Sequence, residues 1–162
     1  MSQYKIYVDL DGVLADFNRE LKRLGFSEQQ FAADPKRKKV FWQLIGAMAK
    51  RGEQFWGVMY PLPDAAKLWQ YVKPHSPEIL SATGHVGNAV PEKREWCAHY
   101  LGADVTVNLV RRSGDKAQYA NPHSILIDDR SKCIDPWVAA GGIGILHTSA
   151  EDTITALKDL GL

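Results

Sequence analysis

The chain has 162 residues, of which 45% are apolar, and its formal net charge at pH 7 is +1. This length suits one domain with a sizeable core, and the near-neutral charge excludes wholesale attraction to nucleic acid or to membrane surfaces. No apolar run approaches the roughly 18 residues that a membrane-spanning helix needs. The two cysteines, Cys97 and Cys133, give no disulfide framework. Free thiols and a start without a secretory pattern predict a cytoplasmic protein.

Five strand-like runs recur along the chain, and helical patterns separate most of them. The runs are residues 4–10, 77–82, 105–110, 124–129 and 142–147. Strands that alternate with helices are typical of a mostly parallel sheet that is covered on both faces. The sequence therefore predicts an α/β fold with a parallel sheet of about five strands. Such sheets bind their ligands at the carboxyl ends of the strands.

Several of the intervening segments carry apolar residues at helical spacing. Residues 14–24 follow the first strand, and residues 65–72 follow a turn signal rich in proline. Residues 96–101 form an apolar stripe that Gly102 is placed to end. Ser149 and Asp152 together resemble a capping box before the apolar residues of the last segment. These patterns predict helices in all four places.

The interval between the first two strands is too long for one crossover helix. No strand pattern occurs from Gly25 to Tyr60, and the segments EQQFAAD, KVFWQLIGAMAKRG and EQFWGV predict two or three helices. We interpret residues 17–60 as a helical cap, and residues 1–16 and 61–162 as the core. The cap carries the basic run Lys36–Lys39, and its aromatic residues include Phe31, Phe41, Trp42, Phe55, Trp56 and Tyr60.

Two aspartates stand at the end of the first strand, separated by Leu10. On a regular strand Asp9 and Asp11 share a face, and where the strand becomes a loop, one side chain and one backbone carbonyl can reach the same cation. The run ILIDD places Asp128 and Asp129 at the end of a later strand, which a switch point can bring beside the first. Such close carboxylates repel unless a cation or a shared proton lies among them. The four acids therefore predict a Mg²⁺ site.

A divalent cation beside an aspartate suits phosphoryl transfer. Asp9 can attack phosphorus to form an aspartyl-phosphate, and Asp11 is placed to protonate the leaving alkoxide and then to activate water. The phosphate oxygens need further donors. The hydroxyl of Ser81 and the charge of Lys116 can supply them.

The order of these motifs resembles that of a known superfamily. DLDGVLADF, ILSA, GDK and LIDD are similar to the four motifs of the haloacid dehalogenase (HAD) superfamily of phosphohydrolases. DGVLADF, FWGVMYPLPDA and GDKAQYANPHSILIDDR resemble one branch, the 5′(3′)-deoxyribonucleotidases. The resemblance covers most of the chain, and it is tight at the motifs and loose in the cap. It implies a HAD-like Rossmannoid core with a small cap. It also implies Mg²⁺-dependent hydrolysis of nucleoside monophosphates, with deoxyribonucleotides as the preferred substrates.

The same resemblance implies a role for each matching residue. Asp9 would be the nucleophile, and Asp11 the acid and base whose carbonyl also meets the metal. The phosphate would be bound at the second motif and by the lysine of the third. The metal ligands would be Asp9, Asp11 and Asp129 with Asp128 in support, the phosphate-binding residues Ser81, Ala82 and Lys116, and the substrate-binding aromatics Phe17, Trp42 and Trp56.

Other interpretations of these residues stay open. Phe17 fits core packing as well as base stacking, and Trp42 and Trp56 fit the core of the cap as well as the wall of a pocket. Lys36–Lys39 fit a solvated face as well as steering of an anionic substrate. Arg111 and Arg112 are interpreted as surface charges, and His85 lies close after the second motif. A phosphatase for another small metabolite or for a nucleic-acid terminal phosphate is an alternative, as is a HAD-like binding module without turnover. The sequence does not choose between monomer and homodimer, or between 5′ and 3′ phosphates.

Overall fold

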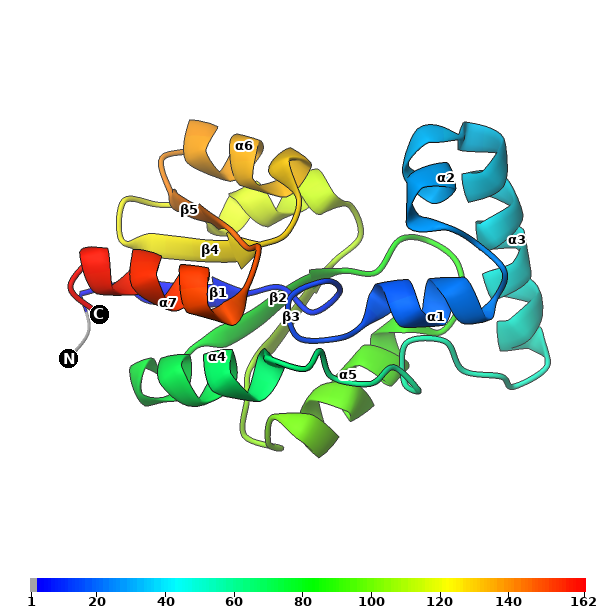
Figure 1. Ribbon diagram of the computed structural model, residues 1–162, viewed down its shortest axis with the longest axis horizontal. Helices are drawn as coiled ribbons and strands as arrows, with labels where there is room; N and C mark the ends of the chain where they lie inside the picture. Colours follow the sequence, from blue (N-terminus) through cyan, green and yellow to red (C-terminus); the bar gives the residue numbers. More distant parts are fainter. Residues whose placement is uncertain (1–2) are drawn as a thin grey trace.

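The computed structural model describes residues 3–162, which build a five-stranded parallel sheet with helices on both faces (Figure 1). Each of the five predicted runs contains one strand, so the predicted α/β class and the parallel sheet are confirmed. The sheet order is β3-β2-β1-β4-β5, and it places the carboxyl ends of β1 and β4 side by side at the switch point. The strands are β1 (Lys5–Val8), β2 (Glu78–Ala82), β3 (Val107–Val110), β4 (Ser124–Asp128) and β5 (Ile143–Leu146).

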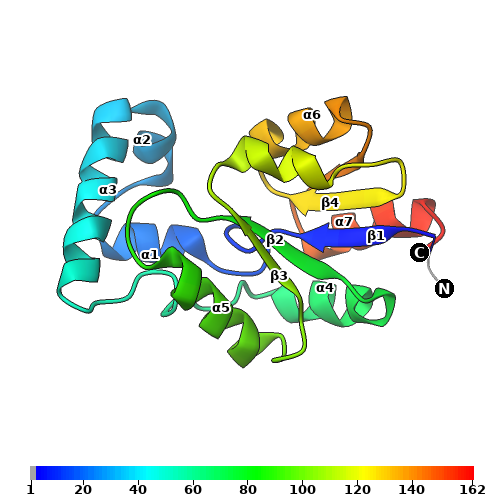
Figure 2. The same ribbon diagram turned by 180° about the vertical axis from the view of Figure 1, so that it is seen from behind.

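Alternating side chains along the strands divide the core into two halves. Ile6 and Val8 of β1 belong to the larger half, with apolar residues of α4, α5 and α7. Tyr7 points the other way and packs with Leu126 and with Trp137 of α6. Figures 1 and 2 show α6 on one side of the sheet and α4, α5 and α7 on the other. The helices of the core are α4 (Ala65–Val72), α5 (Ala89–Tyr100), α6 (Ser131–Ala139) and α7 (Ala150–Asp159), with 3₁₀ helices η1 (Lys73–His75) and η2 (Ser113–Tyr119).

Three helices follow β1 and come before α4. They are α1 (Phe17–Arg23), α2 (Glu28–Ala33) and α3 (Pro35–Lys50). A side chain caps the first turn of each helix by accepting a hydrogen bond from a backbone N–H, and these caps are Asp16, Ser27 and Asp34. The three helices lie beyond the carboxyl ends of the strands, where the sequence places ligand binding (Figure 2).

The prediction of a further helix at residues 53–58 is wrong, because this segment is irregular. The cause is the buried carboxylate of Glu92 on α5. Its Oε2 accepts hydrogen bonds from the backbone N–H groups of Phe55, Trp56 and Gly57 at 2.9, 2.7 and 3.1 Å. These three hydrogen bonds satisfy the backbone donors of residues 55–57 without a helix and fix the segment to α5.

Both cysteines are buried and free, as expected. Cys97 and Cys133 lie in different halves of the core, so they cannot meet. Burial raises the pKa of each thiol to about 12, which keeps both thiols protonated at neutral pH. Within residues 3–162, no helix has the length and apolar character needed to cross a membrane.

Candidate active site

Three carboxylates meet where β1 and β4 end. Asp9 follows β1 and is 5% exposed, Asp128 is the fully buried last residue of β4, and Asp129 follows it and faces a cavity. The parallel pairing of the two strands brings them together, and the Asp9 N–H continues it by donating to the carbonyl of Ile127 at 3.0 Å. One oxygen from each carboxylate lies within 4.8 Å of the others.

The electrostatics of this acid cluster favour a bound cation. Desolvation raises the pKa of Asp129 to about 8, and the charges of Asp9 and Asp128 add to this effect. Burial and the charge of Asp9 likewise raise the pKa of Asp128 to about 6, although Lys116 opposes the shift. A divalent cation would offset this repulsion, and a set of carboxylate oxygens without nitrogen or sulfur fits Mg²⁺.

Lys116 reaches the same cluster from η2. Its Nζ lies 2.6 Å from Oδ2 of Asp128 and 3.0 Å from Oδ1 of Asp9, and the residue is 2% exposed. Burial opposes the charged ammonium, but the charges of the two carboxylates outweigh burial and raise the pKa of Lys116. Lys116 is therefore a fixed positive charge directly beside Asp9.

The Asp11 side chain points to a second buried lysine instead of to the acid cluster. Lys93 of α5 is 1% exposed, and its Nζ donates at 2.8 Å to Oδ2 of Asp11, to Oγ of Ser81 and to the carbonyl of Ala82. All three ammonium hydrogens are used, so Lys93 joins the loop after β1 to the end of β2. Ser81 and Ala82 thus lie beside Asp11, and they are held there by a residue outside the predicted site.

Lys93 was missed because no motif marks it, yet the sequence carries a signal. Lys93, Trp96, Cys97 and Tyr100 follow i, i+3, i+4 and i+7, and this is the spacing of one helix face. A lysine that shares a helix face with the apolar residues Trp96 and Cys97 is expected to be buried, and a buried charge needs a partner.

A cavity of about 670 Å³ opens between the cap helices and the strand ends. Asp11 and Asp129 line it from the core side, and the three predicted aromatics line it as well. The rings of Trp42 and Trp56 are stacked with centroids 6.4 Å apart and planes 29° apart. Phe17 lines the same cavity while its ring packs edge-on or tilted against the cap phenylalanines Phe31, Phe41 and Phe55. Phe17 therefore packs within the cap and also lines the cavity, and stacking of a base on its ring stays a prediction.

The basic run of the cap divides between pocket and surface. Lys38 lines the cavity, whereas Lys36 and Lys39 are exposed outside it. Arg37 lies 4.8 Å over the ring of Phe26 and donates to a backbone carbonyl, so it packs within the cap. Arg111 and Arg112 are exposed, as expected, but they line the cavity together with His85.

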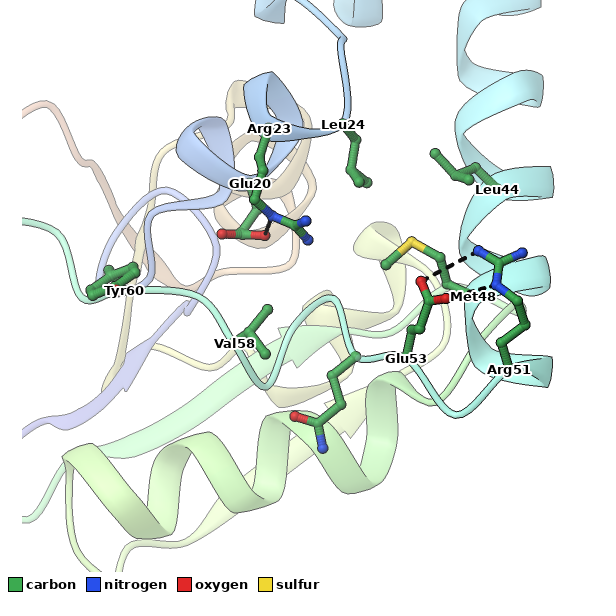
Figure 3. A pocket seen from close by; sticks show the side chains of 10 residues that line it. Glu20, Arg23, Leu24, Leu44, Met48, Arg51, Glu53, Val58 and Tyr60 are labelled. Atoms are coloured by element: carbon green, nitrogen blue, oxygen red, sulfur yellow. Dashed lines mark hydrogen bonds and ion pairs between the residues drawn. The ribbon is translucent and has the colours of Figure 1, made fainter.

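A second cavity of about 600 Å³ lies on another side of the cap, between α1 and the end of α3 (Figure 3). Its charged side chains are already paired: Glu20 with Arg23 at 2.6 Å, and Arg51 with Glu53 at 2.7 Å. None of the residues that line it comes from the strand ends. The cavity beside Asp11 is therefore the candidate active site.

No protein-family model matches the sequence, and no curated protein matches it significantly. Solved structures do share its fold. A haloacid dehalogenase-like hydrolase from Streptococcus pneumoniae is 15% identical with a TM-score of 0.59, over 96% of this chain and 91% of that one. A predicted phosphatase from Clostridium acetobutylicum is 12% identical with a TM-score of 0.55, over the same shares of the two chains.

An L-2-haloacid dehalogenase from Xanthobacter autotrophicus, solved with chloropropionic acid covalently bound, is 14% identical with a TM-score of 0.52. Its match covers 98% of this chain and 83% of that one. At such identities the likeness shows a common fold. The chain therefore has the HAD-like fold that its motifs predict.

Proposed function

We propose that this protein is a Mg²⁺-dependent phosphomonoester hydrolase that works through an aspartyl-phosphate on Asp9. Its expected substrates are nucleoside monophosphates, deoxyribonucleotides first. The observation that carries this proposal is the 3.0 Å pair between Asp9 and Lys116, with Asp128 and Asp129 in the same acid cluster. A nucleophilic carboxylate needs its surroundings to neutralise the phosphate that it attacks. These neighbours supply one cation and the ligands for another.

The reaction follows from the chain's own groups. A carboxylate oxygen of Asp9 attacks phosphorus, the bond from phosphorus to the ester oxygen breaks, and Asp11 gives its proton to the departing alkoxide. Water then attacks the phosphorus of the aspartyl-phosphate and passes a proton to Asp11. The bond between Asp9 and phosphorus breaks, which releases inorganic phosphate. Lys93 holds one oxygen of Asp11 throughout, so the other oxygen is free to carry the proton.

The residues of the acid cluster fit the metal that this chemistry requires. Asp9, Asp129 and the carbonyl of Asp11 would hold Mg²⁺, which when bound neutralises charge on the phosphate oxygens. Asp128 fits a supporting role, because Lys116 donates to its Oδ2 at 2.6 Å and the N–H of Arg130 donates to its Oδ1 at 3.0 Å.

Asp11 also favours an oxygen leaving group over a halide. A halide departs as a stable anion and needs no proton, whereas an alkoxide does. The dehalogenase that shares the fold therefore does not indicate dehalogenation here. The acid Asp11 beside the nucleophile Asp9 favours ester cleavage. Stacked Trp42 and Trp56 in the cavity wall give an aromatic surface of the kind on which a base stacks.

The first test is phosphate release from a panel, with Mg²⁺ or with a chelator. The panel holds deoxy- and ribonucleoside 5′- and 3′-monophosphates and several sugar phosphates. We expect Mg²⁺-dependent release from mononucleotides that falls about a thousandfold or more in Asp9→Asn. The matched control is Asp135→Asn, an exposed aspartate of α6, which keeps full activity.

Each other result has a distinct meaning. Release from sugar phosphates alone would contradict the nucleotide substrate and support the phosphomonoester hydrolysis. No release from folded protein that binds Mg²⁺ would contradict the hydrolase and favour a binding module. Undiminished release in Asp9→Asn would exclude Asp9 as the nucleophile.

A further inference from the structure

Five cationic side chains line the active-site cavity. Lys38 comes from α3, Arg111 and Arg112 follow β3, and Arg130 and Lys132 lie at the start of α6. Across residues 3–162, none of the five forms an ion pair with a carboxylate. We call these five residues the cationic rim.

Three members of the cationic rim lie close enough to repel one another. Burial lowers the pKa of Lys132, and the positive charges of Arg130 and then Lys38 lower it further. Lys38 belongs to the cap and the other two to the core, so two separate parts of the chain bring their charges to one cavity. Gathering like charges costs free energy unless an anion lies among them.

The acids of the cavity do not supply that anion. Asp11 is paired with Lys93, and Asp129 belongs to the acid cluster. Glu28 of α2 is the one further acid among the residues that line the cavity. The cavity is therefore lined by five cations and by one acid, Glu28, that belongs neither to the pair with Lys93 nor to the acid cluster.

The scissile phosphate does not account for the cationic rim either. Lys116 already stands beside Asp9, and the acid cluster fits a divalent cation at the same point. A neutral base and sugar need no positive charge. The positive charges of the cationic rim are thus available to bind a second anionic group on the same ligand.

We propose that the cationic rim binds a second phosphate group of the substrate, so that preferred substrates are nucleotides bearing a further phosphate. A nucleoside 3′,5′-bisphosphate and the phosphodiester beside the terminal phosphate of a short oligonucleotide both offer this group. Arginine suits it because its planar fork binds phosphate oxygens in pairs. A cavity of about 670 Å³ is within the range of small-ligand sites. This inference rests on the proposed function for the placement of the scissile phosphate.

The test measures binding apart from turnover. Asp9→Asn protein with Mg²⁺ is titrated in a calorimeter with thymidine 5′-monophosphate, thymidine 3′-monophosphate, thymidine 3′,5′-bisphosphate and 5′-phosphorylated dithymidylate. We expect the bisphosphate, the dinucleotide or both to bind about tenfold tighter than either monophosphate. The arm that shows the advantage identifies the source of the second phosphate. Equal affinities for all four ligands would overturn the proposal.

A matched pair of variants locates the effect. Lys38→Gln/Lys132→Gln removes two charges from the cationic rim, and Lys36→Gln/Lys39→Gln removes two exposed charges of the cap outside the cavity. The affinity advantage should vanish in the first variant and persist in the second. An equal loss in both would show long-range attraction in place of a site, and would also overturn the proposal.

The outcome separates this inference from the proposed function. Tighter binding of the doubly phosphorylated ligands without phosphate release from the unmutated protein would keep the second-phosphate site and contradict the hydrolase. Phosphate release from monophosphates, together with equal affinities for all four ligands, would support the hydrolase and contradict the second-phosphate site.

Discussion

At the scale of single residues, two buried lysines have different partners and different consequences. Lys116 contacts Asp9 and Asp128, which are the proposed nucleophile and its buried neighbour. Lys93 contacts Asp11 and Ser81, and none of its hydrogens is left for a substrate. We therefore interpret Lys116 as a charge that acts on phosphate and Lys93 as a positioning residue for the acid and base.

Glycine is required at position 12 for two separate reasons. Gly12 has a φ of +83°, and a Cβ there would lie 2.1 Å from Oδ2 of Asp129. We expect Gly12→Ala to lose about 1–2 kcal/mol of unfolding free energy through backbone strain. It should also lose most phosphatase activity and the stabilisation by Mg²⁺, because Asp129 must move. Denaturant unfolding and thermal unfolding with and without Mg²⁺ measure these effects.

Gly25→Ala is the matched control for that substitution. Gly25 has a φ of +85°, and a Cβ added there would have no other atom within 4 Å. The variant should show the same loss of stability and keep activity and the response to Mg²⁺. Equal losses of activity in the two variants would mean that strain, and not the position of Asp129, is responsible.

At the scale of elements, the first turn of α5 joins the cap to the strand ends. Glu92 holds the backbone of residues 55–57, and the next residue, Lys93, holds Asp11 and Ser81. The returning segment of the cap carries Trp56 into the cavity wall. This segment and Asp11 are thus held by two adjacent residues of α5. Glu92 therefore fixes residues 55–57 of the cap to α5.

Removing that carboxylate should displace the returning segment. Glu92→Ala leaves three backbone N–H groups without their acceptor, and we expect a loss of about 3 kcal/mol in unfolding free energy. KM should rise more than kcat falls, because Trp56 lines the cavity and Asp9 lies elsewhere. Steady-state kinetics beside denaturant unfolding test this. Glu95→Ala, an exposed glutamate of the same helix, should change neither, and a comparable effect there would exclude the specific role of Glu92.

The elements show which patterns can be interpreted locally. α4 and α7 match their predictions, because an apolar stripe and a cap such as Ser149 are encoded within one helix. Residues 53–58 do not, because their conformation depends on a carboxylate 35 to 37 residues away along the chain. A local pattern carries no information about such a partner.

At the scale of the whole molecule, we expect the acid cluster to couple stability to pH and to a bound metal. Asp129 has its pKa raised from 3.8 to about 8 in the folded protein. Between these two values the folded state holds a proton that the unfolded chain has lost, so the metal-free protein should lose stability as pH rises towards about 8. His147 acts in the opposite sense below its ordinary pKa of 6.5, because burial lowers its pKa and stability falls as pH falls. The loss due to Asp129 should therefore be clearest between about 6.5 and 8.

Thermal unfolding over this window, with a chelator or with Mg²⁺, measures the coupling. Mg²⁺ should raise the melting temperature most at the alkaline end, where the cluster is ionised. Asp129→Asn should flatten the pH dependence of the metal-free protein. An unchanged slope in that variant would assign the pH dependence to other groups.

The parallel α/β fold and the cluster of acids at its strand ends could both be predicted from the sequence. Apolar alternation and helix signals are local, and in a parallel sheet residues at strand ends share one edge, so Asp9 and Asp129 could be brought together without coordinates. The partners that other elements supply to these residues could be identified only in the folded structure. Lys93 binds Asp11, Glu92 binds the backbone of the cap, and the cationic rim collects charges from three parts of the chain. All three features join residues that are far apart in the chain. Such contacts depend on how helices pack around the sheet, which no single segment encodes.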